Sequence, residues 1–400
     1  MQKSEVVAIL MKNVNYIIGS ENIETKPITP YSDMVCEFLN EISSKLMKST
    51  VIRTYTDLSA LAFWCRKGNI QRLKEIFGDS SNRLGRGLCF HIAPSNIPIN
   101  SIFSYFFGLL AGNANIVRLS AKEFPQVDSI CELIKNVITK YPEIEKRTAF
   151  VKYERDDEIS ESFSRIADCR MIWGGDKTIS IFKRYETKPR CTDITFPDRY
   201  SICIIDGNTI KNTGDEEIKR LSENFYNDTY LMDQNACSSP QLIYWTNDSK
   251  EAREKFWDFV YDYAKSKYTL QDAVAVDKYT KLCEDAILYD NIGKTTNRTN
   301  LLYRSEINIL TDNITEIRGK GGYFYEYALN DRSDLFKIIN EKYQTITYFG
   351  IDAKALQQDL INNNIQGIDR IVPIGKAMDI GPIWDGHNLI KELSREITVC

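Results

Sequence analysis

Residues 87–120, GLCFHIAPSNIPINSIFSYFFGLLAGNANIVRLS, decide the fold of this 400-residue chain. The short apolar run GLCFHI (87–92) predicts a strand, the apolar residues of about 100–111 predict a helix, and NIVRLS (115–120) predicts a second strand. Alternation of strands and helices of this length indicates a parallel, doubly wound α/β sheet. Such sheets bind nucleotides at the ends of their strands.

The alternation continues downstream through two series of elements. The first series is completed by a helix at about 125–140, a strand at 149–153, a helix near 157–167, a strand at 169–174 and a helix near 176–186. The second series contains strands at 200–206, 241–245, 307–310, 323–329 and 344–350, with helices near 215–227, 250–266 and 270–290. The polar stretch DNIGKTTNRTN (290–300) is expected to be a loop within the second series.

The two series predict two α/β domains. We expect a mostly helical N-terminal region at 1–80, because apolar residues recur every three or four positions around 31–46 and 56–77. A cofactor-binding domain is expected at 81–199, a catalytic domain at 200–375, and a C-terminal segment at 376–400.

Composition and charge narrow the class of function. The chain has 51 basic and 55 acidic residues and no basic block, which argues against nucleic-acid binding. The longest apolar stretch (97–112) is interrupted by polar residues and is too short to span a bilayer. No signal peptide is read at the N-terminus. None of the ten cysteines forms a C-x-x-C pair, which is typical of reduced thiols in a cytoplasmic protein.

Histidine and glycine patterns exclude several kinds of site. The only histidines, His91 and His387, lie nearly 300 positions apart, which excludes a His-rich zinc site, and we expect no metal. Gly85 and Gly87 begin a dinucleotide fingerprint that lacks its third glycine and precedes its strand. Gly174 and Gly175 resemble the end of a phosphate loop, but that loop needs a glycine immediately before its lysine, and Asp176 stands there.

Cys237 has a sequence context unlike that of the other cysteines. It lies in the polar stretch DQNACSSP (233–240), directly before an apolar strand, whereas most of the others lie inside apolar runs. A thiolate in a polar loop ahead of regular structure can be stabilised by backbone N–H groups, which makes it a nucleophile. On local context alone, a buried or incidental thiol is the alternative.

Two further residues are candidates for binding roles. Asn96 lies in a turn made rigid by Pro94 and Pro98, where its amide could donate a hydrogen bond; the alternative is an asparagine that satisfies its own turn. Arg118 ends a strand and suits an adenosine ribose or phosphate; the alternative is a solvated cation.

Taken in order, these segments resemble the aldehyde dehydrogenase superfamily. PSNIP (94–98) resembles the turn whose asparagine, here Asn96, helps to form the oxyanion hole. GNANIVR (112–118) resembles the strand whose basic residue faces the cofactor ribose, and IWGG (172–175) resembles the turn that packs near the pyrophosphate and nicotinamide. NAC (235–237) resembles the nucleophile segment. The resemblance implies two doubly wound α/β domains of aldehyde dehydrogenase type with a helical N-terminal region.

The chain is more similar still to the long-chain acyl-CoA reductases of the bacterial bioluminescence fatty-acid reductase type. The similarity extends over about 85–395 and rests on HIAPSNIP, GLLAGNANIVRLS, DQNACSSPQLIYW, QTITYFG and RIVPIGKAMDIGPIWDGHNLI. It implies that Cys237 attacks an acyl thioester, that the Cys237 N–H and the Asn96 side chain hold the oxyanion, and that NAD(P)H reduces the acyl-enzyme to an aldehyde.

One departure from the general aldehyde dehydrogenases bears on the reaction. They carry E-L-G-G-K, whose glutamate activates the hydrolytic water, whereas the corresponding stretch here is TFPDRYS (195–201). Without a positioned base, water attack on an acyl-cysteine is slow and hydride transfer is unaffected, so reduction is favoured over oxidation. Asp198 is the carboxylate nearest to the missing one.

The resemblance also implies a cofactor site. Arg118, Ser120 and Lys122 would meet an adenosine 2′-phosphate, so we expect NADPH, with NADH as the alternative. Gly174 and Gly175 would allow close approach of the backbone to the cofactor. Glu326 would hold the nicotinamide ribose, against the alternative of a solvated strand residue. No role is assigned to His387 beyond a structural one.

Two rival functions stay open. One is an NAD(P)-dependent enzyme of the same fold that oxidises aldehydes, and the other is a silent scaffold subunit of a fatty-acid reductase-like complex. The partners implied by the resemblance are acyl-CoA or an acylated carrier or protein, an acyl-protein synthetase, and further copies of the chain in a homo-oligomer.

Overall fold

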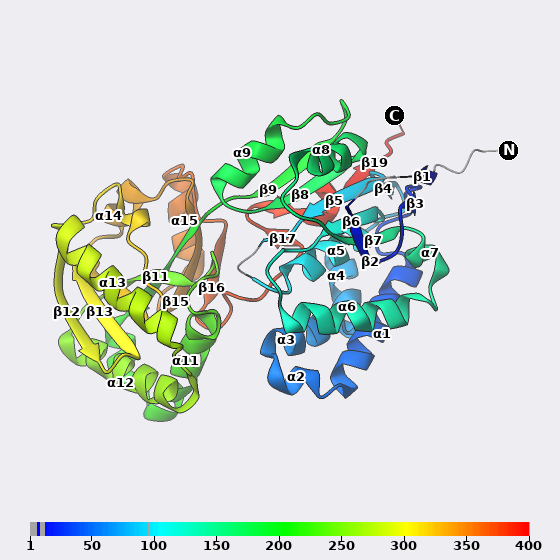
Figure 1. Ribbon diagram of the computed structural model, residues 1–400. Coiled ribbons are helices and arrows are strands. Elements are labelled where there is room, and N and C mark those ends of the chain that lie inside the picture. Colours follow the sequence, from blue (N-terminus) through cyan, green and yellow to red (C-terminus); the bar gives the residue numbers. More distant parts are fainter. Residues whose placement is uncertain (1–5, 9–12, 95–96, 400) are drawn as a thin grey trace. The chain divides into compact units, whose positions relative to one another are not determined.

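A computed structural model describes residues 6–8, 13–94 and 97–399, and the chain folds into two compact units (Figure 1). The first unit comprises Met1–Pro197 and Pro382–Cys400, and the second comprises Asp198–Gly381. The last residues of the chain therefore join the first unit and do not form a segment of their own. In the described ranges no helix is long and apolar enough to cross a membrane.

The sheet of the first unit has the strand order β2-β7-β6-β5-β8-β9 and is parallel except at β2. Every residue of β5 and of β8 is buried, as expected for central parallel strands that are covered on both faces. From β5 the chain winds outward through β6 and β7, and then returns to β8 on the other side of β5. The topological switch point of the sheet therefore lies between β5 and β8. The strands are β2 (Asn15–Ile18), β5 (Leu88–Ile92), β6 (Ala114–Arg118), β7 (Thr148–Lys152), β8 (Cys169–Trp173) and β9 (Thr192–Phe196).

The helices of the first unit lie where the apolar spacing predicts them. In α5 every residue is buried, which explains why the sequence of this helix is apolar all round. Helices α8 and α9 contribute Phe163 and Phe182 to the core on one side of the sheet. The helices are α1 (Asp33–Lys48), α2 (Val51–Thr54), α3 (Thr56–Trp64), α4 (Lys67–Phe77), α5 (Asn100–Leu110), α6 (Pro125–Ile138), α7 (Pro142–Glu145), α8 (Asp157–Ile166), α9 (Asp176–Arg184) and α16 (Leu389–Glu392).

The expectation of a mostly helical N-terminal region is wrong for its first part. Residues before Tyr31 form β1 (Val6–Ala8), β2 and β3 (Asn22–Glu24), of which β1 pairs with β3 and β2 pairs antiparallel with β7. Gly19 follows β2 with φ of +74°, and a Cβ there would lie 2.0 Å from the Thr148 carbonyl oxygen. Pairing with a distant edge strand decides this segment, and local periodicity does not report such pairing.

The end of the chain is held in the first unit by a short antiparallel pair. β19 (Ser394–Glu396) pairs with β4 (Arg83–Gly85), and Arg83 forms a salt bridge of 2.7 Å with Glu396. The pair β17 (Ile383–Trp384) and β18 (His387–Asn388) precedes it. His387 bonds to the Glu392 carboxylate at 2.9 Å, which gives it a place in the packing of this segment.

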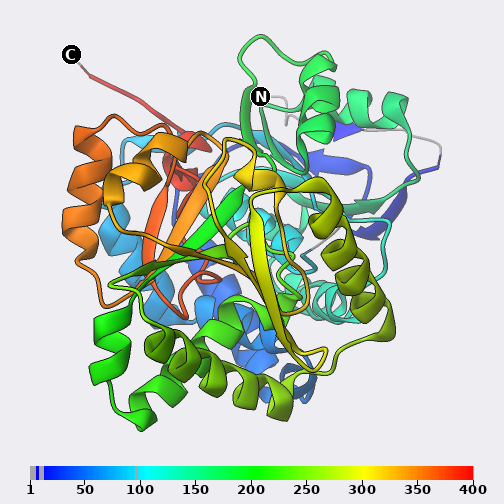
Figure 2. The same ribbon diagram turned by 90° about the vertical axis from the view of Figure 1, so that its left-hand side faces the viewer.

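The sheet of the second unit has the order β12-β13-β14-β11-β10-β15-β16, and only β12 runs antiparallel (Figure 2). Helices α10 (Gly207–Asn212), α11 (Asp215–Asp228) and α12 (Lys250–Lys267) pack on one face. On the other face pack α13 (Asp272–Leu288), α14 (Arg332–Ile338) and α15 (Ala353–Asn362). The strands are β10 (Tyr200–Asp206), β11 (Pro240–Thr246), β12 (Ile292–Arg298), β13 (Leu302–Ile307), β14 (Tyr323–Ala328), β15 (Tyr343–Phe349) and β16 (Arg370–Pro373).

Two expectations for the second unit need correction. The stretch 290–300, expected to be a loop, contains β12. The strand expected at 307–310 lies earlier in the chain, because β13 ends at Ile307. β12 is an edge strand that bonds to a neighbour on one side only and is partly exposed. Its polar sequence is what a solvated edge tolerates, so neither hydrophobicity nor alternation marks it.

His91 lies in a buried polar network at the centre of the first unit. Its Nδ1 lies 2.8 Å from Ser104 Oγ in α5, and its Nε2 lies 2.9 Å from Asn115 Oδ1 in β6. Trp173 of β8 donates its indole N–H to the same Ser104 Oγ at 3.1 Å. Gly108 leaves room for the network, since a Cβ there would lie 1.9 Å from Asn115 Oδ1. Complete burial lowers the pKa of His91 to about 4, so it is a neutral structural residue.

We expect this network to make the stability of the protein depend on pH. Because the pKa of His91 is lower in the folded chain than in the unfolded chain, acid protonates the unfolded state first. The free energy of unfolding should therefore fall by about 2 kcal/mol between pH 7 and pH 5. Urea titrations of the wild type, His91→Gln and the control His387→Gln at both pH values measure the effect. The dependence should weaken only in His91→Gln; an unchanged dependence there would assign it to other groups.

Candidate active site

Cys237 lies in a tight turn that joins the 3₁₀ helix η1 (Tyr230–Met232) to β11. Asp233 and Gln234 both have left-handed backbone conformations, with φ of 51° and 59°. Each such residue costs roughly 1 kcal/mol, so the turn persists only because its surroundings hold it. Positive φ at two residues that are not glycine is typical of functional sites, where a side chain is aimed by the backbone.

Hydroxyl groups fix the turn on the side of Cys237. Ser201 in β10 donates its hydroxyl to the Cys237 carbonyl oxygen at 2.6 Å, and accepts the Thr345 N–H at 3.2 Å. Ser239 donates to the Asp228 carbonyl oxygen at 2.8 Å. The backbone around Cys237 is thereby tied to β10, to β15 and to the end of α11.

Asp228 extends this support to the segment after β16. Its carboxylate accepts the N–H groups of Gly375 at 2.6 Å and of Ala377 at 3.0 Å. Burial raises the pKa of Asp228 to about 7, while the two N–H donors lower it. Asp228 therefore holds the Gly375–Ala377 backbone near the turn that carries Cys237.

Exposure separates Cys237 from most of the other cysteines. Cys237 is half-buried, and the thiols of Cys65, Cys89 and Cys131 are buried in the first unit. Cys203, which is also buried, lies in the same unit as Cys237. Burial raises the pKa of each of these four thiols, which makes thiolate formation unfavourable.

Asp198, the carboxylate of the stretch in which the glutamate is missing, is engaged in an ion pair. Thr195 lies within β9, where the general aldehyde dehydrogenases would have their glutamate in the aligned stretch. Asp198 forms a salt bridge of 2.8 Å with Arg318. The Asp198 carboxylate is therefore held by a guanidinium from the loop before β14.

The first unit brings several predicted cofactor residues to the switch point of its sheet. Gly174 and Gly175 follow β8, and Gly175 caps the N-terminus of α9 without a side-chain hydrogen bond. A Cβ at Gly175 would meet nothing within 4 Å, so the backbone there is open to a close approach. Pro94 follows β5 at the same edge, and Asn96 after it lies outside the described residues. The expected oxyanion role of Asn96 stays a prediction.

The strand-end cations are placed differently from each other. Lys122 and Ser120 line one small concavity together with Pro94 and Pro98. Arg118 instead stacks its guanidinium over the Tyr153 ring, 4.5 Å from the centroid. Its Nε is buried and has no hydrogen-bond partner among the residues that the structure describes. A buried guanidinium nitrogen without a partner is unusual and fits a bound oxygen atom.

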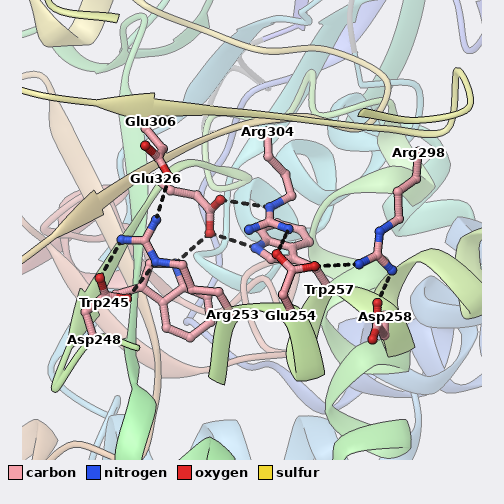
Figure 3. A network of polar contacts seen from close by, with 10 residues as sticks. All are labelled: Trp245, Asp248, Arg253, Glu254, Trp257, Asp258, Arg298, Arg304, Glu306 and Glu326. Carbon is pink, nitrogen blue, oxygen red and sulfur yellow. Dashed lines mark hydrogen bonds and ion pairs between the residues drawn. The ribbon is translucent and has the colours of Figure 1, made fainter. Parts of the chain in front are cut away.

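Glu326, expected to hold the nicotinamide ribose, lies in a buried network of polar contacts in the second unit (Figure 3). Its side chain is 1% exposed, and Oε1 accepts the indole N–H groups of Trp245 at 2.8 Å and Trp257 at 2.7 Å. Oε2 accepts Arg304 Nε at 2.8 Å. Both oxygens are thus engaged inside the second unit, which does not support a ribose-binding role, and the alternative of a solvated strand residue is wrong because the side chain is buried. The sequence contains no local signal for this ion pair, because its partners lie 22 to 81 positions away.

Sequence reasoning missed Ser201 and the structural part played by Gln234, because both act through distant backbone groups. No group of three or more His, Cys, Asp or Glu residues that could hold a metal occurs in the described part of the chain.

Comparison with known proteins gives matches to one family and one fold. Residues 70–265, which include Cys237, match the model of the acyl-CoA reductase (LuxC) family. The chain is 26% identical over 168 residues to long-chain acyl-protein thioester reductase 2 of Photobacterium leiognathi, over 42% of this chain and 33% of the relative. It is 25% identical over 170 residues to the long-chain acyl-protein thioester reductase of Vibrio harveyi, with the same coverage. The alignments thus span about a third of these relatives.

Solved structures show the same fold at low sequence identity. An NAD-dependent benzaldehyde dehydrogenase from Corynebacterium glutamicum matches with a TM-score of 0.60 and 11% identity, over 92% of this chain and 85% of that one. Aldehyde dehydrogenase 21 from Physcomitrella patens matches with a TM-score of 0.63 and 10% identity, over 90% and 84% of the two chains. The fold is that of the aldehyde dehydrogenases, and the similarity of this chain to the acyl-CoA reductases of the LuxC family is confirmed.

Proposed function

We propose that this protein is an acyl-thioester reductase, which converts a long-chain acyl thioester to a fatty aldehyde through an acyl-enzyme on Cys237. The observation that carries the proposal is the Cys237 turn, a strained and firmly held loop with a half-exposed thiol, within the segment that matches the acyl-CoA reductase family. The names of the curated relatives support a protein-bound acyl thioester as substrate.

In the proposed mechanism the Cys237 thiolate attacks the thioester carbonyl and expels the thiol of the donor. Such a thiol leaves without help from a general acid because its basicity is low. The backbone N–H of Cys237 and the side chain of Asn96 donate to the oxyanion. A reduced nicotinamide cofactor, when bound, supplies the hydride for the second half-reaction, after which the Cys237 sulfur leaves and the aldehyde is free.

The residues of the first unit fit such a cofactor. The open backbone at Gly175, directly after Gly174, lies at the switch point of the sheet, where dinucleotides bind in this class of fold. Arg118 has a buried nitrogen without a partner among the described residues, and Lys122 and Ser120 line a concavity. These cations favour NADPH, with NADH as the alternative.

Reduction is favoured over oxidation because the acyl-enzyme has no carboxylate base at Thr195, and Asp198 is paired with Arg318. An aldehyde oxidiser of the same fold is the rival, and incubation with aldehyde and NAD(P)+ in the absence of a thiol acceptor separates the two. Rapid turnover under those conditions would identify the oxidiser.

The proposal extends to the partners of the enzyme. We infer that the acyl donor is acyl-CoA or an acylated carrier or protein, that an acyl-protein synthetase supplies it, and that the chain forms a homo-oligomer. A silent scaffold subunit is the second rival, and it would show no acyl transfer to the protein.

The first prediction from this function concerns the nucleophile. Cys237→Ala should abolish covalent labelling by radioactive long-chain acyl-CoA, because the acyl group is held on that sulfur. Cys203→Ala is the matched control, since Cys203 is buried in the same unit and should leave labelling unchanged. Labelling that survives Cys237→Ala would refute the mechanism.

The second prediction concerns the choice of cofactor. Lys122→Ala should lower kcat/KM for NADPH by about 10-fold or more and change the value for NADH little, because a charge-assisted bond to the 2′-phosphate is lost. Arg118→Ala should weaken NADPH binding as well. Lys140→Ala removes an exposed lysine that pairs with Glu41 and is the charge-matched control. A wild-type enzyme that clearly prefers NADH would contradict this assignment.

A further inference from the structure

A loop before β14 backs the turn that carries Cys237. Residues 319–322 (GKGG), named here the glycine loop, require glycine at three positions. A Cβ at Gly319 would lie 1.7 Å from the Tyr323 carbonyl oxygen, and one at Gly322 would lie 2.2 Å from the Leu301 carbonyl oxygen. Gly321 and Gly322 have φ of +58° and +90°. The loop is therefore a close-packed surface without side chains at these positions, where another backbone can approach.

Gln234 bonds to the end of this loop through both atoms of its side-chain amide. Its Oε1 accepts the Gly322 N–H at 2.8 Å and the Tyr323 N–H at 3.1 Å, and its Nε2 donates to the Tyr323 carbonyl oxygen at 3.0 Å. Gln234 is 3% exposed and lies three residues before Cys237. Because the amide oxygen accepts two of these bonds and the amide nitrogen donates the third, the planar group has one orientation that satisfies all three.

Two more contacts join the turn to the same loop. The Gly321 N–H donates to the Asp233 carbonyl oxygen at 3.2 Å. Gln241, at the start of β11, donates to the Gln234 carbonyl oxygen at 3.0 Å and accepts the Gly319 N–H at 2.9 Å. The chain is thus bonded to the glycine loop both before and after Cys237.

Lys278, in α13, binds the glycine loop from the side of that helix. Its ammonium donates to the carbonyl oxygens of Gly321, at 2.8 Å, and of Asn300, and lies 4.8 Å from the centre of the Tyr303 ring. The residue is 1% exposed, and burial lowers the pKa of its ammonium to about 8. A buried ammonium held by carbonyl oxygens needs those oxygens to stay in place, so Lys278 and the glycine loop fix each other.

The orientation of α13 shows that these polar bonds dominate its packing. The helix buries Lys278 and Asp285, while Val276 is 64% and Ile287 is 78% exposed. Burial of apolar surface alone would turn the helix the other way. Asp285 accepts hydrogen bonds from the hydroxyls of Tyr323 at 2.8 Å and Tyr325 at 2.6 Å. The two buried ionisable residues of α13, Lys278 and Asp285, therefore bind the glycine loop and the strand that follows it.

We propose that Gln234 is a positioning residue for Cys237. Its side chain fixes the turn that carries Cys237 to the glycine loop, and Lys278 binds the same loop through the Gly321 carbonyl oxygen. The inference rests on the proposed role of Cys237 as the nucleophile. The bonds of the Gln234 side chain to Gly322 and Tyr323, called here the Gln234 clamp, hold Asp233 and Gln234 in their left-handed conformations. Without it the turn relaxes toward an ordinary conformation and carries the sulfur away from the position for attack.

The test replaces the amide by groups of the same length. Gln234→Met removes all three bonds and should lower the single-turnover rate of acyl transfer to Cys237 by about 10- to 100-fold, as expected for a displacement of about 1 Å, with KM little changed. Val260→Ala, in the packing of α12 on the sheet, is the control, because it lowers the thermal midpoint without touching the turn.

Gln234→Glu gives a readout that loss of stability alone would not produce. A neutral carboxylic acid reproduces the acceptor and the donor of the amide, whereas a carboxylate repels the Tyr323 carbonyl oxygen. The deficit of this variant relative to wild type should therefore shrink at pH 6 and grow at pH 8.5. The ionisable groups that face the clamp, Asp233 with Tyr268 on one side and Lys278 on the other, are the same in both proteins, so the ratio of rates cancels their titration.

Lys278→Met should reduce acyl transfer in the same direction. Since both residues act through the glycine loop, the effects of Lys278→Met and Gln234→Met should combine to less than their product.

Substrate-independent alkylation separates failure of this proposal from failure of the proposed function. The rate at which iodoacetamide modifies Cys237 should also fall in Gln234→Met. Mass spectrometry of the peptides measures this rate, with the exposed Cys283 as the internal standard. A folded Gln234→Met protein that acylates and alkylates at the wild-type rate would overturn the positioning role, as would a pH-independent deficit in Gln234→Glu. Failure of acyl-CoA to label the wild type would overturn the proposed function, while the alkylation rates would still decide the positioning role.

Discussion

The buried imidazole of His91 is the contact on which the first unit depends. It lies in β5 and is bonded to α5 through Ser104 and to β6 through Asn115, while Trp173 of β8 shares the Ser104 hydroxyl. These four elements are the ones whose ends form the edge of the sheet where a dinucleotide would bind. Parallel strands buried on both faces have few polar side chains to set their relative positions. A satisfied polar network at their centre supplies that registration, and Gly108 is the residue that leaves space for it.

The second unit solves the corresponding problem with charge and with backbone contacts. On one side of β14, the carboxylate of Glu326 accepts from Arg304 and two indoles, and Arg304 continues to Glu254 on α12 (Figure 3). This network fixes β13 and β14 against the helix. The glycine loop that enters β14 is therefore a firm surface, and the strained turn before β11 rests on it. The turn that carries Cys237 is fixed to these strands by hydrogen bonds to the backbone of the glycine loop, and such bonds tolerate little displacement.

The chemistry follows from what the site offers and from what it withholds. A half-exposed cysteine in a fixed turn can accept an acyl group, whereas burial raises the pKa of the thiols of Cys65, Cys89, Cys131 and Cys203, which react poorly. The carboxylate of Asp198 forms a salt bridge with Arg318. Under the proposed function, an acyl-enzyme without a positioned base would have a longer life against hydrolysis, which would give hydride transfer time to compete. That balance would distinguish the proposed reductase from an oxidiser built on the same fold.

The sequence by itself determined the alternation of strands and helices, the special context of Cys237 and the missing glutamate at Thr195. Each of these is a local property, because hydrophobic period and motif spacing are written in neighbouring residues. Tertiary structure alone decided the strands before Tyr31, the edge strand β12 and the burial of Glu326, since their partners lie far away in the chain. It also decided which face of α13 is buried: the apolar pattern would have turned Lys278 outward, and bonds to a loop 43 residues away hold it inside. Long-range pairing of polar groups leaves no periodic trace in a single sequence, and for that reason Cys237 could be singled out from its motif while the groups that hold its turn in place could not.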